Sequence, residues 1–435
     1  MFQIFWNKLR SRIPPAVLAL VAVQGLWMYY DAVVTSRQYH RPKRKPVPVT
    51  ESSPLSPFYP PSPGQEYTGF SRAFPVWKDQ PFPCSTLMKE NDLYSRAAIE
   101  DGLVFVKEME VGSTLFAGIT ARIAERVGQK KLQQQQQQQS SSSSEMDGGS
   151  GSNMTKKLCN ARVMPMRARK FEKRSAHASF LWSVVQEPVE RVMHKAFHYA
   201  KLRKKPVLPM SLADFQDIVL SFETQDYGYY FRTLPVRRKL NPYNKDERHL
   251  YVQELLESYD FVGVRERLHE TLAVLQILLG LETQDVLFLQ SPYVATATKD
   301  PTVSQTDYYE QWNKGECREI PSPEITLDMK KWFHSEEFEA FIEADVLVYK
   351  AVNQSLDKTI DAIGRDRVQK AVNQLKWALD GAKEACQNVR FPCSAAGKQQ
   401  KPNDCFFSDV GCGHECLDQF GQSLSKNPKF QKLSQ

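Results

Sequence analysis

Short apolar runs alternate with stretches of helical periodicity along this chain, and this alternation narrows the possible folds more than any other feature. The runs cover residues 102–106, 178–185 and 259–264. Amphipathic segments lie at 115–127, 187–202, 211–222, 266–281 and 365–389. Each run suits a buried strand and each amphipathic segment suits a helix. The pattern therefore predicts an α/β domain whose central, mainly parallel sheet is flanked by helices.

Two of the predicted strands end in turns that suit an anion. After the first strand, the turn "KEMEVGST" offers the hydroxyls of Ser113 and Thr114 at the start of a helix. After the second strand, Pro188, Arg191 and His194 lie at the start of another helix. The unpaired amides and the dipole of a helix N-terminus attract phosphate or sulfate. The first turn lacks the spacing of a Walker A loop, and an ordinary strand-to-helix turn is the alternative.

The first 85 residues have the composition of a membrane anchor and its stalk. Residues 1–12 form a short basic tail, and the apolar residues that follow predict a transmembrane anchor over 13–34. A cleaved signal peptide is the alternative, but no small-residue cleavage site follows the apolar core. Basic residues flank both ends, so charge does not fix the orientation of the span. The Pro- and Ser-rich residues 35–85 are expected to form an extended stalk.

A folded domain is expected over residues 86–430, with one Gln/Ser-rich insertion at 130–155 that is predicted to be disordered. Five of the eight cysteines lie in a tail at 386–416. Their even number favours disulfides, and a zinc site that includes His414 is the alternative. Two glycosylation sequons, at Asn153 and Asn353, agree with a secretory route.

The net charge of the chain is modest, at +7 over 435 residues. This charge is compatible with anionic ligands and does not indicate nucleic acid as a partner. Basic residues are concentrated at 162–174, 201–205 and 232–239. Such runs are most often solvated surface, and recognition of a phosphate or sulfate is the alternative.

Three blocks of the sequence resemble one enzyme family. The stretches "FVKEMEVGSTLFAGITARIA" and "SFLWSVVQEPVERVMHKAFHY" are similar, in this order, to the donor-binding segments of the Golgi membrane carbohydrate sulfotransferases. The galactose 3-O-sulfotransferase and heparan 2-O-sulfotransferase branch is the most similar, and "DFVGVRERLHETLAVL" resembles a third, more specific segment. The resemblance implies a P-loop-like sulfotransferase fold and a single-pass Golgi membrane protein with a luminal domain. It also implies a glycan or glycolipid acceptor.

The resemblance further implies how the co-substrate, 3′-phosphoadenosine 5′-phosphosulfate, would bind. It would lie between the two strand-end turns, without a metal, and would donate its sulfuryl group to a sugar hydroxyl. The residues at matching positions are Lys107, Gly112, Ser113, Thr114, Gln186, Arg191 and His194.

Three positions depart from the family pattern in the donor-binding segments. Glu110 stands in place of a lysine that would assist the leaving phosphate, and Gln186 stands in place of an arginine. His194 replaces a serine and is expected to donate to a phosphate when protonated. These departures keep open the alternative of a catalytically inactive relative that binds a glycan or acts as a scaffold partner in the Golgi. A general base must take the proton of the sugar hydroxyl. The candidates near the second strand are His177, His198 and Glu187.

Overall fold

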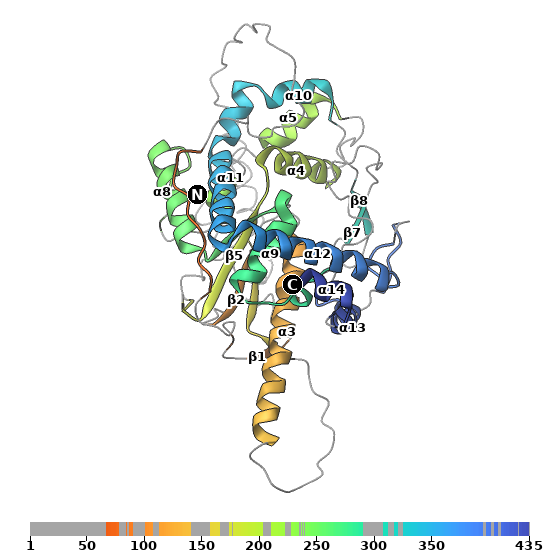
Figure 1. Ribbon diagram of the computed structural model, residues 1–435. Coiled ribbons are helices and arrows are strands. Elements are labelled where there is room, and N and C mark those ends of the chain that lie inside the picture. The colour runs from red at the N-terminus through yellow and green to blue at the C-terminus, as the bar shows by residue number, and fades with distance from the viewer. Residues whose placement is uncertain are drawn as a thin grey trace, which may run out of the picture. The chain divides into compact units, whose positions relative to one another are not determined.

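A computed structural model places residues 66–435 in one compact unit (Figure 1). The described residues are mainly 67–77, 101–107, 113–140, 157–165, 177–202, 210–221, 228–234, 240–289, 308–311, 317–320, 325–394, 397–401, 404–407, 410–424 and 426–434. The predicted basic tail, the predicted membrane span 13–34 and most of the predicted stalk lie outside them. Within the described ranges, no helix is both long and apolar enough to cross a membrane.

A four-stranded parallel sheet forms the centre of this unit. Its strands, in the order of their hydrogen bonding, are β4 (Ala161–Pro165), β2 (Gly102–Lys107), β5 (Ser179–Val185) and β6 (Phe261–Val264). Each of the three pairings is parallel. β2, β5 and β6 are almost entirely buried, as expected for parallel strands covered on both faces. The predicted α/β class with a parallel sheet is confirmed.

Helices flank the sheet (Figure 1). α3 (Ser113–Ser140) packs on β2, and α9 (Leu268–Leu278) packs on β6. The long helix α11 (Glu336–Ile363) also contacts β6, and α12 (Arg365–Ala385) packs on α9. The predicted helix over 365–389 thus ends four residues earlier than expected.

A second apolar cluster lies beside the start of α11. It is enclosed by α4 (Pro188–Leu202), α5 (Leu212–Ser221) and α10 (Leu327–Phe333). Phe215 lies edge-on to Trp332 and Phe333, with ring centroids 5.9 and 5.7 Å away. Ser211 caps α5, since its hydroxyl accepts a hydrogen bond from the Asp214 amide at 3.1 Å.

The remaining elements are two small sheets and several short helices. Two small antiparallel sheets pair β1 with β3 and β7 with β8. The bounds are β1 Leu87–Lys89, β3 Lys157–Cys159, β7 Tyr308–Gln311, β8 Cys317–Ile320, α7 Tyr229–Thr233, α8 Lys245–Ser258, η3 Arg265–Arg267, η4 Thr283–Val286, α13 His414–Leu424 and α14 Pro428–Ser434.

The packed domain begins before residue 86, which corrects the predicted end of the stalk. Phe74 lies edge-on to Phe261 with ring centroids 5.4 Å apart, and Trp77 lies 5.7 Å from Phe180 in the same way. Both side chains are buried. Burial of two large aromatic side chains favours packing over the extended conformation that the proline content predicts.

The predicted disordered insertion is helical in its first part. α3 continues through the glutamine run to Ser140, so residues 130–140 belong to that helix. Glutamine has a high intrinsic helix propensity, and a helix that is already nucleated extends at little cost. The rest of the insertion, 141–155, lies outside the described residues.

All eight cysteines are paired, which confirms the disulfide prediction. The pairs are Cys84–Cys159, Cys317–Cys393, Cys386–Cys416 and Cys405–Cys412. The zinc alternative for the tail is wrong, because cysteines held in disulfides offer no thiolate to a metal.

One of the two sequons is unsuited to carry a glycan. Asn353 lies within α11, where its Oδ1 accepts a hydrogen bond from Arg267 at 2.9 Å. Ser355 of the same sequon is fully buried. The folded protein therefore does not present Asn353 for glycosylation, and Asn153 lies outside the described residues.

Candidate functional site

The carboxyl ends of β2 and β5 lie side by side at one edge of the sheet. Phe105 is in register with Trp182, and the Ser183 hydroxyl donates to the Val106 carbonyl at 2.9 Å. β2 precedes α3, which starts at Ser113, and β5 precedes α4. The prediction that neighbouring strands both end in strand-to-helix turns is confirmed. In open parallel sheets, ligands bind at this edge.

Much of the first turn lies outside the described residues. This holds for residues 108–112, which include Glu110 and Gly112, and for the side chain of Ser113. Lys107 ends β2, Thr114 lies in the first turn of α3, and both are half-buried. The contacts predicted for these residues with the co-substrate stay predictions.

The turn after β5 is held by hydrogen bonds from two directions. The Gln186 amide donates to the Tyr230 hydroxyl at 2.8 Å, and this hydroxyl donates to the Gln186 carbonyl at 2.6 Å. The Glu187 amide donates to Oε1 of Glu266 at 3.0 Å. Oε2 of Glu187 accepts from the Glu190 amide at 2.8 Å, so Glu187 caps the first turn of α4.

His194 lies between Gln186 and Arg265. Its Nδ1 is 3.1 Å from Nε2 of Gln186 and 3.4 Å from Nη1 of Arg265. Burial and, next, the charge of Arg265 lower the pKa of His194 to about 4. Because both neighbours donate, Nδ1 of the neutral ring accepts and Nε2 carries the proton. The ring is therefore neutral near neutral pH, and its Nε2–H group can still donate; the predicted contact of His194 with a phosphate stays a prediction.

Arg191 points into the interior. Its side chain is 0% exposed and pairs with Asp345, which is also 0% exposed, at 3.0 Å. Its guanidinium lies 4.0 Å from the ring centroid of Tyr229. This placement contradicts the predicted contact between Arg191 and the co-substrate, because the charge is used to neutralise a buried carboxylate.

The structure supports neither of the two histidines that were predicted as a general base. His177 is exposed and precedes β5, at the amino edge of the sheet. The strand spans about 20 Å at about 3.3 Å per residue, so His177 is far from Gln186 and its candidacy is contradicted. His198 lies in α4, but its side chain is outside the described residues, so its role stays a prediction.

Glu187, the third candidate, lies among other acidic groups. Desolvation raises the pKa of Glu187 to about 7. Desolvation also raises the pKa of Glu266, even though that side chain stays exposed, and its Oε2 accepts from the Tyr349 hydroxyl at 3.3 Å. Burial, followed by these carboxylates, raises the pKa of Tyr349. Glu187 can therefore exchange a proton near neutral pH, which suits a general base.

Four residues of this edge are absent from the sequence prediction. Arg265 and Glu266 follow β6 inside the block "DFVGVRERLHETLAVL", so their place after a predicted strand was a usable signal. Asp345 and Tyr349 belong to α11, which the sequence analysis missed. The available signal for that helix was the cap Ser335 followed by glutamates in the first turn.

The opposite pKa shifts of Glu187 and His194 predict two opposite pH dependences of the free energy of unfolding, which cancel in the wild type. In the unfolded chain these groups titrate near 4.5 and 6.5, against about 7 and about 4 in the folded protein. Glu187 stabilises the folded state at low pH, and this stabilisation is lost as pH rises through about 7. His194 stabilises the folded state at higher pH, and this stabilisation is lost as pH falls through about 4. Between about pH 4.5 and 6.5 each state binds one of the two protons, so the two slopes cancel.

Replacing Glu187 or His194 alone should therefore make the pH dependence due to the other residue measurable. Glu187→Gln is expected to lose about 2 kcal/mol of stability as pH is lowered from about 6.5 to about 4.5, after allowance for solvent screening. His194→Asn is expected to lose a similar amount as pH is raised over the same range. Guanidinium unfolding of both variants at several pH values measures this, and parallel curves for the two would contradict the assignment.

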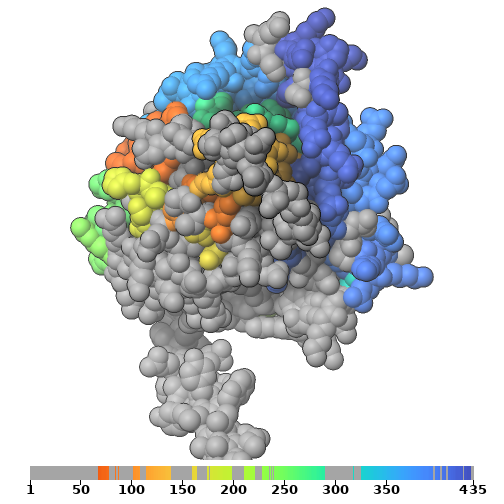
Figure 2. Space-filling view, turned by 90° about the horizontal axis from the view of Figure 1, so that it is seen from below, coloured from red at the N-terminus to blue at the C-terminus, as the bar shows by residue number. Residues whose placement is uncertain are grey.

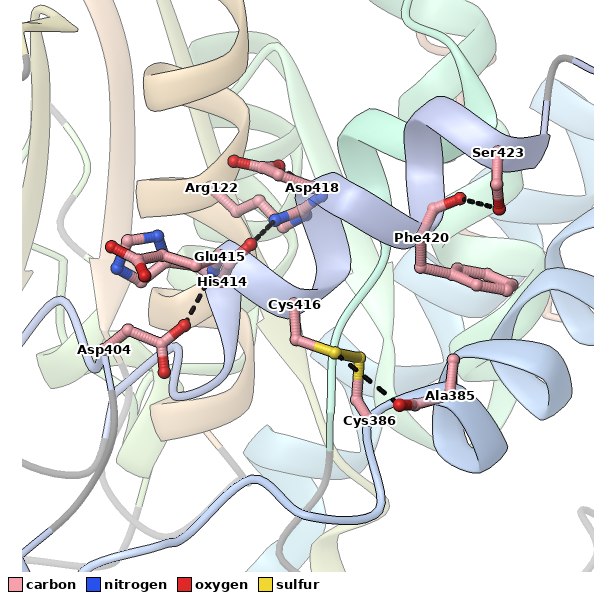
Figure 3. Close-up of a disulfide and its surroundings, with 10 residues drawn as sticks. All are labelled: Arg122, Ala385, Cys386, Asp404, His414, Glu415, Cys416, Asp418, Phe420 and Ser423. Carbon is pink, nitrogen blue, oxygen red and sulfur yellow. Dashed lines mark hydrogen bonds and ion pairs between the residues drawn. A yellow bond between two sulfur atoms is a disulfide. The ribbon is translucent and has the colours of Figure 1, made fainter.

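A second group of ligand-type side chains lies where α3 meets the C-terminal segment, which is dark blue in Figure 2. Figure 3 draws Arg122, His414 and Asp418 from this region, beside the Cys386–Cys416 disulfide. Ligand atoms of Glu125, His414 and Asp418 lie within 4.8 Å of one another. Arg122 and Arg126 pair with Asp418 at 2.8 and 3.7 Å. Arg126 and Lys130 also pair with the buried Asp285, at 3.3 and 3.0 Å. Because three cations thus balance the three carboxylates of Glu125, Asp285 and Asp418, a divalent cation would add uncompensated charge to a buried site. We interpret the group as a charge network that fastens α13 to α3.

No family model matches this chain, and no curated protein or solved structure matches it either. The assignment of function therefore depends on the strand-end geometry and on the short blocks of sequence.

Proposed function

We propose that this domain transfers a sulfuryl group from 3′-phosphoadenosine 5′-phosphosulfate to a sugar hydroxyl of a glycan, glycolipid or polysaccharide. The observation that carries the proposal is the parallel pairing of β2 with β5, each of which precedes a helix. Such an edge brings two helix N-termini to one place, and their dipoles favour a ligand with anionic groups. Two of the three blocks that resemble carbohydrate sulfotransferases coincide with these elements, and the third covers β6 and the start of α9. The proposed setting is the Golgi membrane, with residues 13–34 as the anchor and the domain in the lumen.

Glu187 is the proposed general base. Above about pH 7 its side chain is a carboxylate, which takes the proton of the sugar hydroxyl as the hydroxyl oxygen bonds to sulfur. The bond between sulfur and the bridging oxygen of the donor breaks, and 3′-phosphoadenosine 5′-phosphate leaves with the electron pair. Glu266 positions Glu187 through the hydrogen bond to its backbone amide.

A non-catalytic relative that binds a glycan is the second candidate, and one observation favours it. Glu187, Glu190 and Glu266 gather at the strand ends, while the charge of Arg191 is paired with Asp345. Carboxylates repel an anionic donor but accept hydrogen bonds from sugar hydroxyls. Such a protein would bind a glycan and leave the nucleotide unbound.

Calorimetric titration of the purified full chain with 3′-phosphoadenosine 5′-phosphate, together with a sulfate-transfer assay, separates the two candidates. The enzyme should bind this product with micromolar affinity. Glu187→Gln should lower kcat by about 100-fold and leave the affinity unchanged, because glutamine keeps an acceptor for the Glu190 amide but cannot take a proton. The wild-type kcat should fall as pH drops below about 7.

Glu190→Gln serves as the matched control, since it removes a carboxylate from the same turn and should keep most of the activity. Absence of binding at millimolar nucleotide would support the glycan-binding candidate. Full activity of Glu187→Gln would reject Glu187 as the base.

A further inference from the structure

Lysine side chains gather on two helices of the C-terminal segment, α12 and α14. These helices pack against each other (Figure 1). Residues 365–389 and 419–435, which contain them, hold eight basic and three acidic residues, so they account for most of the net charge of +7. Six of the lysines form no ion pair within the described part of the chain, and together they are called the lysine surface: Lys370, Lys376, Lys383, Lys426, Lys429 and Lys432.

An aromatic contact holds the two helices of the lysine surface together. The rings of Trp377 on α12 and Phe430 on α14 have centroids 5.8 Å apart, and both side chains are half-buried. Lys429 directly precedes Phe430. Lys370 lies about two helical turns before Trp377, on the same face of α12. The contact therefore places lysines of both helices around one pair of rings.

Few carboxylates oppose these charges. The acidic residues of the two segments are Asp366, Asp380 and Glu384, which all belong to α12. A surface with an excess of one charge attracts ligands of the opposite charge. A lysine ammonium is a hydrated point charge on a flexible stem, and it imposes no fixed geometry on its partner. Because the lysines are spread over two helices, a polymer with repeated negative charges suits them better than one small anion.

The aromatic residues of this surface favour a hydrated polyanion over an anionic bilayer. Helices that bind membranes present large apolar side chains to the lipid. Trp377 and Phe430 pack on each other instead. None of the exposed large hydrophobic residues in the described chain lies on α12 or α14. A sulfated polysaccharide supplies repeated negative charge and requires no insertion of apolar groups.

We propose that the lysine surface binds a sulfated polysaccharide chain, apart from the strand-end turns. The choice of this polyanion rests on the proposed function, since sulfuryl transfer to a polysaccharide yields a chain with additional negative charge. The lysine surface would keep such a chain on the domain while the nucleotide product leaves, so that further hydroxyls of the same chain could react.

The lysine surface extends toward the helix that follows β6. Burial and, next, the charge of Lys376 lower the pKa of His269, while the charge of Asp380 opposes this shift. Lys376 is therefore near His269, which lies in the first turn of α9, five residues after the end of β6. A chain bound along α12 would thus pass close to the element that follows the carboxyl end of this strand.

Binding of the full chain to dextran sulfate, with unsulfated dextran as the reference, tests the proposal. The wild type should bind dextran sulfate and not dextran, and the affinity should fall steeply as salt is raised. Lys429→Gln combined with Lys432→Gln should weaken dextran sulfate about 10-fold at low salt and reduce the salt dependence, because two contacts with the polyanion are lost. Lys376→Gln combined with Lys383→Gln should have a similar effect.

Lys245→Gln combined with Lys331→Gln is the matched control. It removes two exposed lysines from α8 and α10, with the same loss of net charge, and should change the affinity less than about twofold. Equal losses in all three double variants, or no loss in any of them, would overturn the lysine surface. Tighter binding of the wild type to phosphatidylserine vesicles than to dextran sulfate would overturn the choice of a polysaccharide.

Calorimetry with 3′-phosphoadenosine 5′-phosphate keeps this test separate from that of the proposed function. All three double variants should bind the nucleotide as the wild type does. Nucleotide binding without dextran sulfate binding would reject the lysine surface and leave the proposed function standing. Dextran sulfate binding that depends on the lysine surface, without nucleotide binding, would reject sulfuryl transfer and keep the lysine surface.

Discussion

Replacement of Asp345 by alanine is expected to lower the free energy of unfolding by about 3–5 kcal/mol. Oδ2 of Asp345 pairs with Arg191 at 3.0 Å, and Oδ1 accepts from the Tyr230 amide at 3.0 Å. Both partners of the ion pair are 0% exposed. Removing the carboxylate would leave a buried guanidinium without its neutralising charge, and the interior cannot solvate it.

A double substitution separates the charge from the packing. Arg191→Met with Asp345→Leu should be about 2 kcal/mol less destabilised than Asp345→Ala, because neither charge is then left alone. Methionine can also pack on the ring of Tyr229 that the guanidinium covers. Guanidinium unfolding followed by tryptophan fluorescence measures these differences.

Asp361→Ala provides the control on the same helix. Asp361 pairs with Arg365 at 2.6 Å, but both side chains are exposed, so its loss should cost less than about 1 kcal/mol. A comparably small loss in Asp345→Ala would contradict the buried ion pair.

The same ion pair explains why part of the site could not be predicted. Arg191 was expected at the ligand because it lies in the first turns of a helix that follows a strand, where cations often meet anions. Its direction depends on Asp345, which is 154 residues away along the chain. Sequence periodicity places residues on a helix face, but it does not identify a charged partner on a distant element.

Local features were predictable because they depend on neighbouring residues. Short apolar runs identified β2, β5 and β6, and the strand-to-helix order indicated parallel pairing. Gln186, Glu187 and His194 were recognised because one turn and the start of one helix contain all three. The other residues of the site and the start of the packed domain depend on contacts between elements that are distant in the sequence. Tyr349 contacts Glu266 from α11, and Phe74 and Trp77 bring the end of the predicted stalk onto the sheet.

Removal of the Cys84–Cys159 disulfide, by alanine at both positions, is expected to cost about 4.5 kcal/mol. The two cysteines are 75 residues apart, and the chain between them contains β2 and α3. The crosslink limits the conformations of the unfolded chain, and this effect grows with the logarithm of the loop length. Because the loop also contains the low-complexity insertion, the unfolded chain gains much freedom when the link is lost. Alanine avoids placing an unpaired hydroxyl at Cys159, which is fully buried.

The Cys405–Cys412 disulfide supplies the comparison for loop length. It joins residues seven positions apart, so its removal should cost about 2.4 kcal/mol by the same relation. The two double-alanine variants, unfolded in guanidinium at one pH, should therefore differ by about 2 kcal/mol, with the long-loop variant less stable. Equal losses would mean that native-state packing around each link, and not the entropy of the unfolded chain, sets the contribution of these disulfides.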